Sequence, residues 1–218
     1  MAQSKTFNRR RFLTLVGGAA GFSVLACSGL GVLATLQPSV DYAESTCGEE
    51  TMSEVLVTYA SKAGSTGEVA EAIAKVFCDA GATVDVRPVK EVRDLSGYRA
   101  VVLGSAIRMG SWLSEATSFV KTHKATLAQM PVAYFQVCGE LEKDTEETRK
   151  TTGTYLDPVR ALLEPVASEV FAGKMDFAKL SWLDRSIIKM MGGNEGDWRN
   201  WDAIHAWAEE LIPALKIA

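Results

Sequence analysis

Short apolar runs alternate with amphipathic stretches through residues 54–218, and this alternation predicts a series of strands and helices. Five runs, the last weaker than the others, are rich in β-branched or aromatic residues and end at turn residues, as strands do. The predicted strands comprise residues 54–61, 83–89, 100–106, 131–138 and 168–175. The run 100–106 is almost continuously apolar, which is typical of a central parallel strand covered on both faces.

Apolar residues at helical spacing follow the predicted strands. The helices are expected around residues 69–77, at 114–127 and 148–164, in a short helix opening with the capping-box-like Ser181-Trp182-Leu183-Asp184, and at 201–215. Strands that alternate with helices indicate an α/β fold with a doubly wound, five-stranded parallel sheet. The sequence therefore predicts one such domain over residues 54–218.

The N-terminal 36 residues do not fit this domain. Residues 12–36 carry no charge and follow the basic cluster Arg9-Arg10-Arg11, as a signal peptide or membrane anchor requires. The run from Arg9 to Leu13 resembles a twin-arginine export signal. We therefore expect a membrane-anchored or exported protein on the extracytoplasmic side. Cleavage, lipidation at Cys27 and retention as an anchor all stay open, and the polar residues 37–53 read as a linker.

The distribution of charge and the positions of the cysteines limit the partners and sites that we expect. The net charge of -4 comes from a basic leader and an acidic remainder, so we expect no nucleic-acid partner. Cys27 lies in the leader and Cys47 in the linker, whereas Cys78 and Cys138 fall where small buried hydrophobic residues belong. The four cysteines show no metal-ligand spacing, and their positions do not favour a structural disulfide.

The strongest local motif is the loop between the first strand and the first helix. It consists of Ser61, Lys62, Ala63, Gly64, Ser65 and Thr66. Hydroxyl groups and backbone amides at a helix N-terminus suit a phosphate group. An ordinary helix cap would explain one hydroxyl, but not three in six residues. The loop lacks the signatures of a nucleotide P-loop and of a dinucleotide fold.

The longer segment YASKAGSTGEVAEAIA resembles the FMN-phosphate loop of flavodoxins. Ser61, Ser65 and Thr66 stand at its hydroxyl positions, and Gly64 stands at its glycine. The resemblance implies FMN as the cofactor and a flavodoxin-like sheet of order 2-1-3-4-5. It also implies that the flavin lies beyond the carboxyl ends of the strands, at the switch point between strands one and three.

This placement predicts that the loops after strands three and four frame the flavin ring. Trp112 is the candidate ring neighbour, with a role in the core as the alternative. Arg108 is a candidate anchor for anionic groups, with a solvated charge as the alternative. The predicted ring-binding residues are Ser105, Ala106, Ile107, Arg108, Gly110 and Trp112 in the first loop and Val137, Cys138 and Gly139 in the second.

Three further segments carry a narrower resemblance. GSAIRMG, MPVAYFQV and SWLDRSIIKMMGG resemble the menaquinone-dependent protoporphyrinogen IX dehydrogenases, which are flavodoxin-type enzymes. This implies an FMN-dependent oxidoreductase that takes a porphyrinogen substrate and passes electrons to a quinone. No side chain is predicted as a catalytic acid or base.

An electron-transfer role without an organic substrate is the alternative. That enzyme family has a basic insertion after strand four, whereas residues 140–150 are mostly acidic here. A membrane-tethered or exported flavodoxin-type carrier would use such an acidic surface to dock a redox protein partner.

Overall fold

A computed structural model describes residues 40, 42–48, 54–190 and 192–217. The predicted leader and much of the predicted linker lie outside these described residues. The chain divides into two compact units, of which the larger spans residues 39–178 and 194–218. Within the described ranges, no helix has the length and apolar character that crossing a membrane requires.

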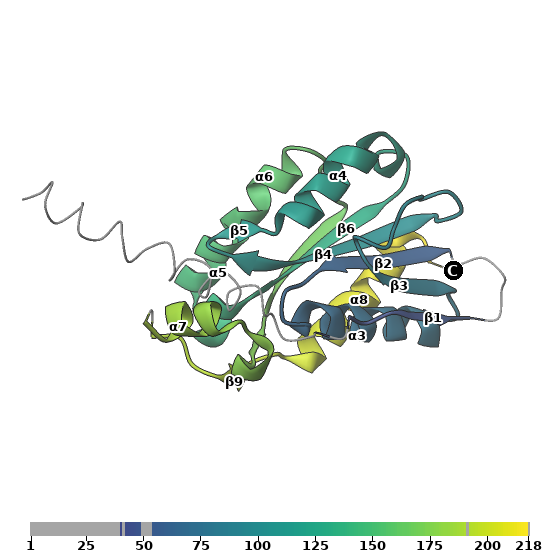
Figure 1. The fold of residues 1–218 in the computed structure, drawn as a ribbon. Coiled ribbons are helices and arrows are strands. Elements are labelled where there is room, and N and C mark those ends of the chain that lie inside the picture. Colours follow the sequence, from purple (N-terminus) through teal and green to yellow (C-terminus); the bar gives the residue numbers. More distant parts are fainter. Residues whose placement is uncertain (1–39, 41, 49–53, 191, 218) are drawn as a thin grey trace, which may run out of the picture. The chain divides into compact units, whose positions relative to one another are not determined.

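The larger unit is built on a mostly parallel sheet of order β1-β3-β2-β4-β6-β7, with β5 paired to β4 (Figure 1). Its five parallel strands, β3-β2-β4-β6-β7, confirm the predicted order 2-1-3-4-5. The strands are β1 (Ser45–Cys47), β2 (Val55–Ala60), β3 (Val84–Pro88), β4 (Ala100–Arg108), β5 (Ser111–Trp112), β6 (Val132–Cys138) and β7 (Ala167–Ala172).

Two features of the sheet differ from the prediction. Residues 45–47 fall in the predicted linker, but they form β1, which pairs antiparallel with the edge strand β3. The predicted fifth strand, 168–175, is also too long. It ends at Ala172, and β8 (Lys174–Met175) pairs instead with β9 (Gly196–Asp197) in a separate two-stranded sheet. Segments this short carry too little apolar pattern to be recognised as strands.

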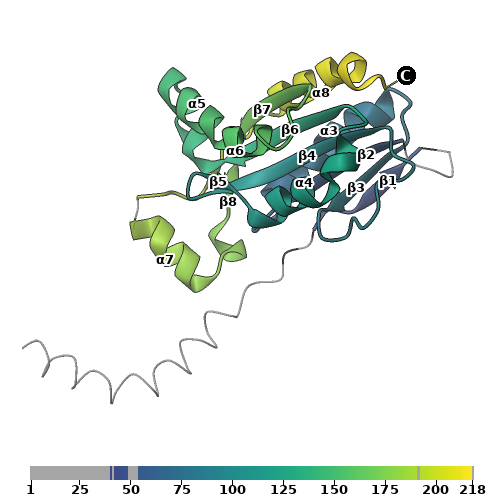
Figure 2. The same cartoon turned by 90° about the horizontal axis from the view of Figure 1, so that it is seen from above.

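Helices cover both faces of the main sheet. In Figures 1 and 2, α3 and α8 lie on one face and α4 and α6 on the other. The helices of this unit are α3 (Ser65–Asp79), α4 (Ser114–Leu127), α5 (Glu146–Gly153), α6 (Asp157–Arg160) and α8 (Trp201–Leu215). Short 3-10 turns also occur at η1 (Gly139–Glu142), η2 (Thr154–Leu156) and η3 (Phe177–Lys179).

The segment predicted to be helical, residues 148–164, is helical as far as Arg160 but is divided into three pieces. The chain forms α5, then η2, then α6, because Pro158 cannot continue a helix but suits the first turn of a new one. By contrast, the predicted bounds of α4 and α8 agree with the structure.

Aromatic packing organises the core on the α8 face. Trp207 of α8 meets the rings of Phe135 and Phe171 edge-on, at centroid distances of 6.4 and 5.6 Å. The backbone of β4 passes so close to Phe135 that a Cβ atom at Gly104 would lie 2.0 Å from the ring. Glycine at position 104 therefore allows the central strands to pack around a large aromatic side chain.

Helix α7 (Trp182–Met190) belongs to the smaller unit. The Ser181 hydroxyl accepts a hydrogen bond from the Asp184 amide (3.1 Å) and donates to the Asp184 carboxylate (2.9 Å). This side-chain cap on the Asp184 amide confirms the predicted start of the helix.

A disulfide joins Cys47 in β1 to Cys78 in α3, with a sequence separation of 31. The prediction of no structural disulfide is therefore wrong. It failed because Cys47 looked like part of a linker, so nothing in the local pattern placed the two cysteines together. Cys138 is buried and free, as its position in an apolar strand indicated.

Candidate functional site

The carboxyl ends of β2, β4 and β6 lie side by side at one edge of the sheet. The register pairs Ala60 with Ser105 across β2 and β4, and Ala106 with Val137 across β4 and β6. The three loops predicted to hold a flavin therefore leave the sheet at neighbouring positions, as open α/β sheets arrange their ligand sites.

The loop after β2 delivers the N-terminus of α3. Gly64 is the N-cap, with φ 88° and ψ -23°, a left-handed conformation that favours glycine. Its amide donates to the Ser61 hydroxyl oxygen at 3.0 Å, and no side chain in the described part of the chain caps the helix. The Ser65 and Thr66 hydroxyls are therefore not used as caps. Amides in the first turn of a helix have no intrahelical partner and favour an anion.

Thr66 carries the most informative atom of the loop. Its side chain is buried, and its Oγ1 atom has no hydrogen-bond partner among the described residues. A buried hydroxyl without a partner costs free energy, so such an atom in a native protein calls for a partner outside the chain, such as a ligand, an ion or an ordered water. The hydroxyl lies in the first turn of α3, where a phosphate oxygen would accept its hydrogen bond. The residues present therefore fit the phosphate group of FMN.

Lys62 and Ala63 complete the predicted phosphate loop. Ala63 is half-buried, whereas the Lys62 ammonium lies 3.0 Å from the Glu115 carboxylate at the start of α4. Burial by itself would raise the pKa of Glu115, but its own backbone amide and Lys62 lower that pKa to about 2. Lys62 thus links the predicted phosphate loop to α4, which covers the face of the sheet opposite to α3.

The region after β4 is more regular than the predicted loop. β4 continues to Arg108 and turns back through Met109 and Gly110, both at positive φ, into β5. The buried Ser105 hydroxyl accepts from the Leu113 amide at 3.0 Å and donates to the Ala106 carbonyl at 2.9 Å. Ser105 thus fixes the base of this hairpin. Ile107 is half-buried and Arg108 is exposed at the edge of the sheet.

Trp112 lies in the core, which was the alternative to a ring contact. It is 6% exposed, and its Nε1 donates to the Gln136 side chain at 3.0 Å. Its ring meets Tyr134 edge-on at a centroid distance of 5.3 Å. A contact between Trp112 and the flavin stays a prediction.

The third predicted loop begins where β6 ends. Val137 and Cys138 are buried, and Gly139 opens the turn η1. Burial raises the pKa of the Cys138 thiol to about 11, so this thiol is protonated at neutral pH. Cys138 is therefore a small hydrophobic residue at the edge of the site rather than a nucleophile.

Tyr155 is a residue that sequence reasoning missed. Its hydroxyl donates to the Glu140 carboxylate at 2.9 Å, and its ring lies beside Gly110, whose added Cβ would be 3.3 Å away. Burial, reinforced by Glu140, raises the pKa of Tyr155 to about 12. Tyr155 therefore connects the two loops predicted to frame the flavin ring. It lies in η2, between α5 and α6, and no local motif marks it.

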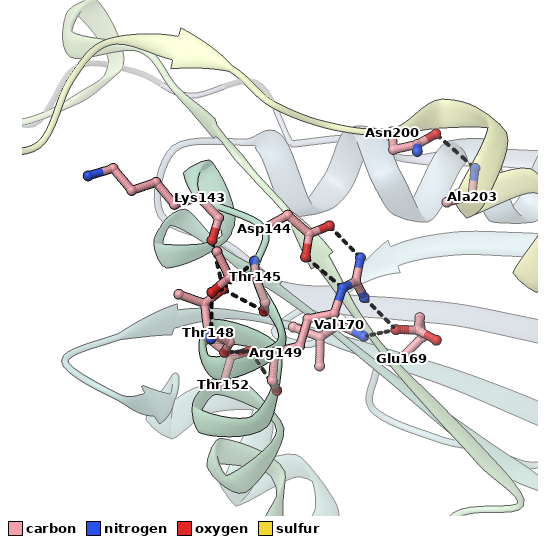
Figure 3. A network of polar contacts seen from close by, with 10 residues as sticks. All are labelled: Lys143, Asp144, Thr145, Thr148, Arg149, Thr152, Glu169, Val170, Asn200 and Ala203. Atoms are coloured by element: carbon pink, nitrogen blue, oxygen red, sulfur yellow. Dashed lines mark hydrogen bonds and ion pairs between the residues drawn. The ribbon is translucent and has the colours of Figure 1, made fainter.

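The acidic segment after β6 is held by a network shown in Figure 3. Arg149 of α5 forms two 2.6 Å hydrogen bonds to Asp144 and lies 3.8 Å from Glu169 of β7. Thr145 and Thr148 form a reciprocal cap at the start of α5. The segment thus has a defined structure, which fixes the polypeptide that carries Tyr155.

Comparison with known proteins identifies the family. The family model described as "Flavodoxin domain" matches residues 56–200, well over half of the chain. The chain belongs to the flavodoxin-domain family. The match includes the loops that follow β2, β4 and β6. It confirms the predicted family and the predicted cofactor, FMN.

Two curated relatives of this flavodoxin domain have the same name. The chain is 29% identical over 182 residues to protoporphyrinogen IX dehydrogenase (quinone) of Escherichia coli K12, covering 75% of this chain and 99% of that protein. It is 28% identical over 178 residues to the protein of that name from Leishmania major, covering 75% of this chain and 76% of that protein.

A solved structure agrees with the fold. Oxidised flavodoxin 1 from Bacillus cereus is 15% identical, with a TM-score of 0.50, covering 73% of this chain and 97% of that one. At this identity, the likeness supports the flavodoxin-like fold alone.

The Lys62–Glu115 pair of the flavodoxin domain predicts a pH dependence. Folding lowers the pKa of Glu115 from 4.5 to about 2. The ionised Glu115 carboxylate therefore stabilises the folded protein fully above pH 4.5, and this stabilisation is lost as the pH falls toward 2. Glu115→Gln should lower the free energy of unfolding by roughly 1 kcal/mol at neutral pH. Denaturant titrations of both proteins should show this difference shrinking below pH 4.5. A difference independent of pH would contradict the assigned ion pair.

Proposed function

We propose that this protein is an FMN-dependent oxidoreductase that dehydrogenates a porphyrinogen-type substrate and passes the electrons to a quinone. The FMN assignment rests on the buried Thr66 hydroxyl in the phosphate loop, which has no hydrogen-bond partner among the residues that the structure describes. Bound FMN would supply the redox chemistry, accepting electrons from one partner and giving them to the other. The protein would supply binding and orientation.

The proposed binding residues divide by loop. Ser61, Ser65 and Thr66 would donate hydroxyl hydrogen bonds to the phosphate, together with amides of the first turn of α3. The hairpin that follows β4 and the turn η1 that follows β6 would flank the ring, and Tyr155 would fix the spacing between them. The exposed Arg108 would attract anionic groups of FMN or of a substrate.

The substrate class rests on similarity along nearly the whole domain. The chain covers 99% of the E. coli relative, including the segments after β7 that lie outside a minimal flavodoxin sheet. Resemblance confined to the phosphate loop would support FMN binding only. Resemblance over the full domain also favours the same substrate class and a quinone acceptor.

The alternative function is electron transfer by a membrane-tethered or exported flavodoxin-type protein without an organic substrate. The segment Glu140–Lys150 favours it, because acidic side chains there lie next to the edge that would hold the flavin. Such a surface suits a basic redox partner.

We further propose an extracytoplasmic location, delivered by the twin-arginine-type leader. The Cys47–Cys78 disulfide supports this proposal, because such bonds persist mainly in oxidising compartments. Arg9→Lys together with Arg10→Lys should leave the protein in the cytoplasmic fraction when cells are separated into compartments. Normal export of this double variant would contradict the proposal.

Thr66→Val tests the phosphate site through two effects of opposite sign. Removing an unpartnered buried hydroxyl should raise the stability of the ligand-free protein by about 1 kcal/mol. Removing a donor to a charged phosphate should weaken FMN binding by about tenfold. Thermal unfolding of the apoprotein and fluorescence titration with FMN measure these two quantities.

Thr58→Val is the matched control for that variant. Thr58 is also buried, but its hydroxyl donates to the Arg87 carbonyl at 2.8 Å. Thr58→Val should therefore lower the stability of the apoprotein by about 1 kcal/mol and leave FMN affinity almost unchanged. Equal FMN affinity in wild type and Thr66→Val would place the phosphate elsewhere.

The substrate is tested with the full-length, FMN-loaded protein under anaerobic conditions. Protoporphyrinogen and a menaquinone analogue should together give porphyrin fluorescence, and neither compound alone should do so. If the protein binds FMN but produces no porphyrin, the dehydrogenase proposal fails. Reduction of the protein by a physiological electron donor, without porphyrinogen turnover, would then favour the carrier.

A further inference from the structure

The segment 42–48 runs along the outer edge of the main sheet. β1 pairs antiparallel with β3, so that Ser45 lies opposite Val86 and Cys47 opposite Val84. Because the direction is reversed, the residues before Ser45 lie toward the carboxyl ends of the parallel strands. That end of the sheet also carries the phosphate loop.

Two tyrosines connect this segment to the loop. The Tyr59 hydroxyl donates to the Ala43 carbonyl at 3.0 Å, and the Tyr42 hydroxyl donates to the Ser61 carbonyl at 3.4 Å. Burial raises the pKa of Tyr59, so its hydroxyl remains a donor. An added Cβ at Gly67, in the first turn of α3, would lie 2.8 Å from the Tyr59 ring. Tyr59 therefore contacts both segment 42–48 and the helix turn that carries Thr66.

The other end of the segment is fixed covalently. Cys47 is bonded to Cys78 in the last turn of α3, and the Thr46 hydroxyl donates to the Asp85 carboxylate at 2.8 Å. A three-residue strand at the edge of a sheet makes few backbone hydrogen bonds and would otherwise fray. The disulfide restricts that fraying by closing the chain between β1 and α3.

We propose that the Cys47–Cys78 disulfide holds segment 42–48 against Tyr59 and Ser61, and that this contact positions the phosphate loop for FMN. Tyr59 is then a positioning residue, because it acts through α3 rather than on the cofactor. The inference rests on the proposed FMN site. A dithiol reductant would supply two electrons and two protons, giving two cysteine thiols and an oxidised dithiol, and would thereby weaken binding of the phosphate.

The test compares FMN with riboflavin, which has the same ring but no phosphate. Full-length protein is titrated with each ligand before and after reduction by dithiothreitol. The dissociation constant of FMN should rise roughly three- to tenfold on reduction, as loss of about one hydrogen bond would cause. That of riboflavin should stay unchanged. A general loosening of the fold would instead weaken the binding of FMN and of riboflavin to a similar extent.

Three variants distinguish the effect of the disulfide from the effect of the Tyr59 hydroxyl. Cys47→Ser with Cys78→Ser should match the reduced wild type and should not respond to dithiothreitol. Tyr59→Phe keeps the disulfide and should still weaken the binding of FMN but not that of riboflavin. The proposal therefore stays testable if the reduced protein unfolds. Tyr134→Phe is the matched control, because its hydroxyl donates to the Leu163 carbonyl at 3.1 Å on the opposite face. It should leave the ratio of the two affinities unchanged.

The outcomes also separate this inference from the proposed function. Equal FMN affinity in the oxidised and reduced proteins would overturn the positioning role of the disulfide. Parallel weakening of FMN and riboflavin would overturn it as well. If the oxidised wild type binds neither ligand, the proposed FMN site itself fails. If it binds riboflavin as tightly as FMN, the assignment of the phosphate loop fails.

Discussion

The junction between β2 and α3 is the constraint on which the site depends. Gly64 turns the chain in a left-handed conformation, and α3 begins there without a side-chain cap. A hydroxyl side chain at the N-cap would satisfy the first amides internally and compete with a ligand. Without such a cap, the helix N-terminus favours an anion, and the buried Thr66 hydroxyl adds a donor for which residues 40, 42–48, 54–190 and 192–217 offer no acceptor.

The parallel sheet brings two further loops to the edge at which α3 begins. Parallel pairing of β2, β4 and β6 brings the loops after these strands to one edge, although they are far apart in sequence. The turn after β6 then leads into an ordered acidic segment, from which Tyr155 reaches back to Glu140 and the hairpin after β4. The elements proposed to bind the ring and those proposed to bind the phosphate are thus positioned by separate parts of the chain. Substitutions in one can be separated from substitutions in the other.

Much of this arrangement was predictable from local pattern. Alternating strands and helices predicted a parallel sheet, and the resemblance of the loop at residues 61–66 to flavodoxins implied its strand order. The hydroxyl and glycine residues of that loop predicted where a phosphate would bind. The contacts that the sequence did not reveal are those between distant segments. Cys47 and Cys78 meet because a three-residue strand joins the sheet edge, and Tyr155 contacts Glu140 and Gly110 from the short turn η2 between α5 and α6. Neither contact leaves a periodic signal.

The most direct test of the account is an amide chemical-shift titration of the uniformly labelled, full-length apoprotein with FMN. If the phosphate binds at the start of α3, the largest shifts should fall on the amides of residues 64–66. Smaller shifts are expected in the loops after β4 and β6. Repetition with riboflavin should remove the shifts at 64–66 and keep the others. Large FMN-induced shifts elsewhere, with residues 64–66 unchanged, would contradict the proposed site.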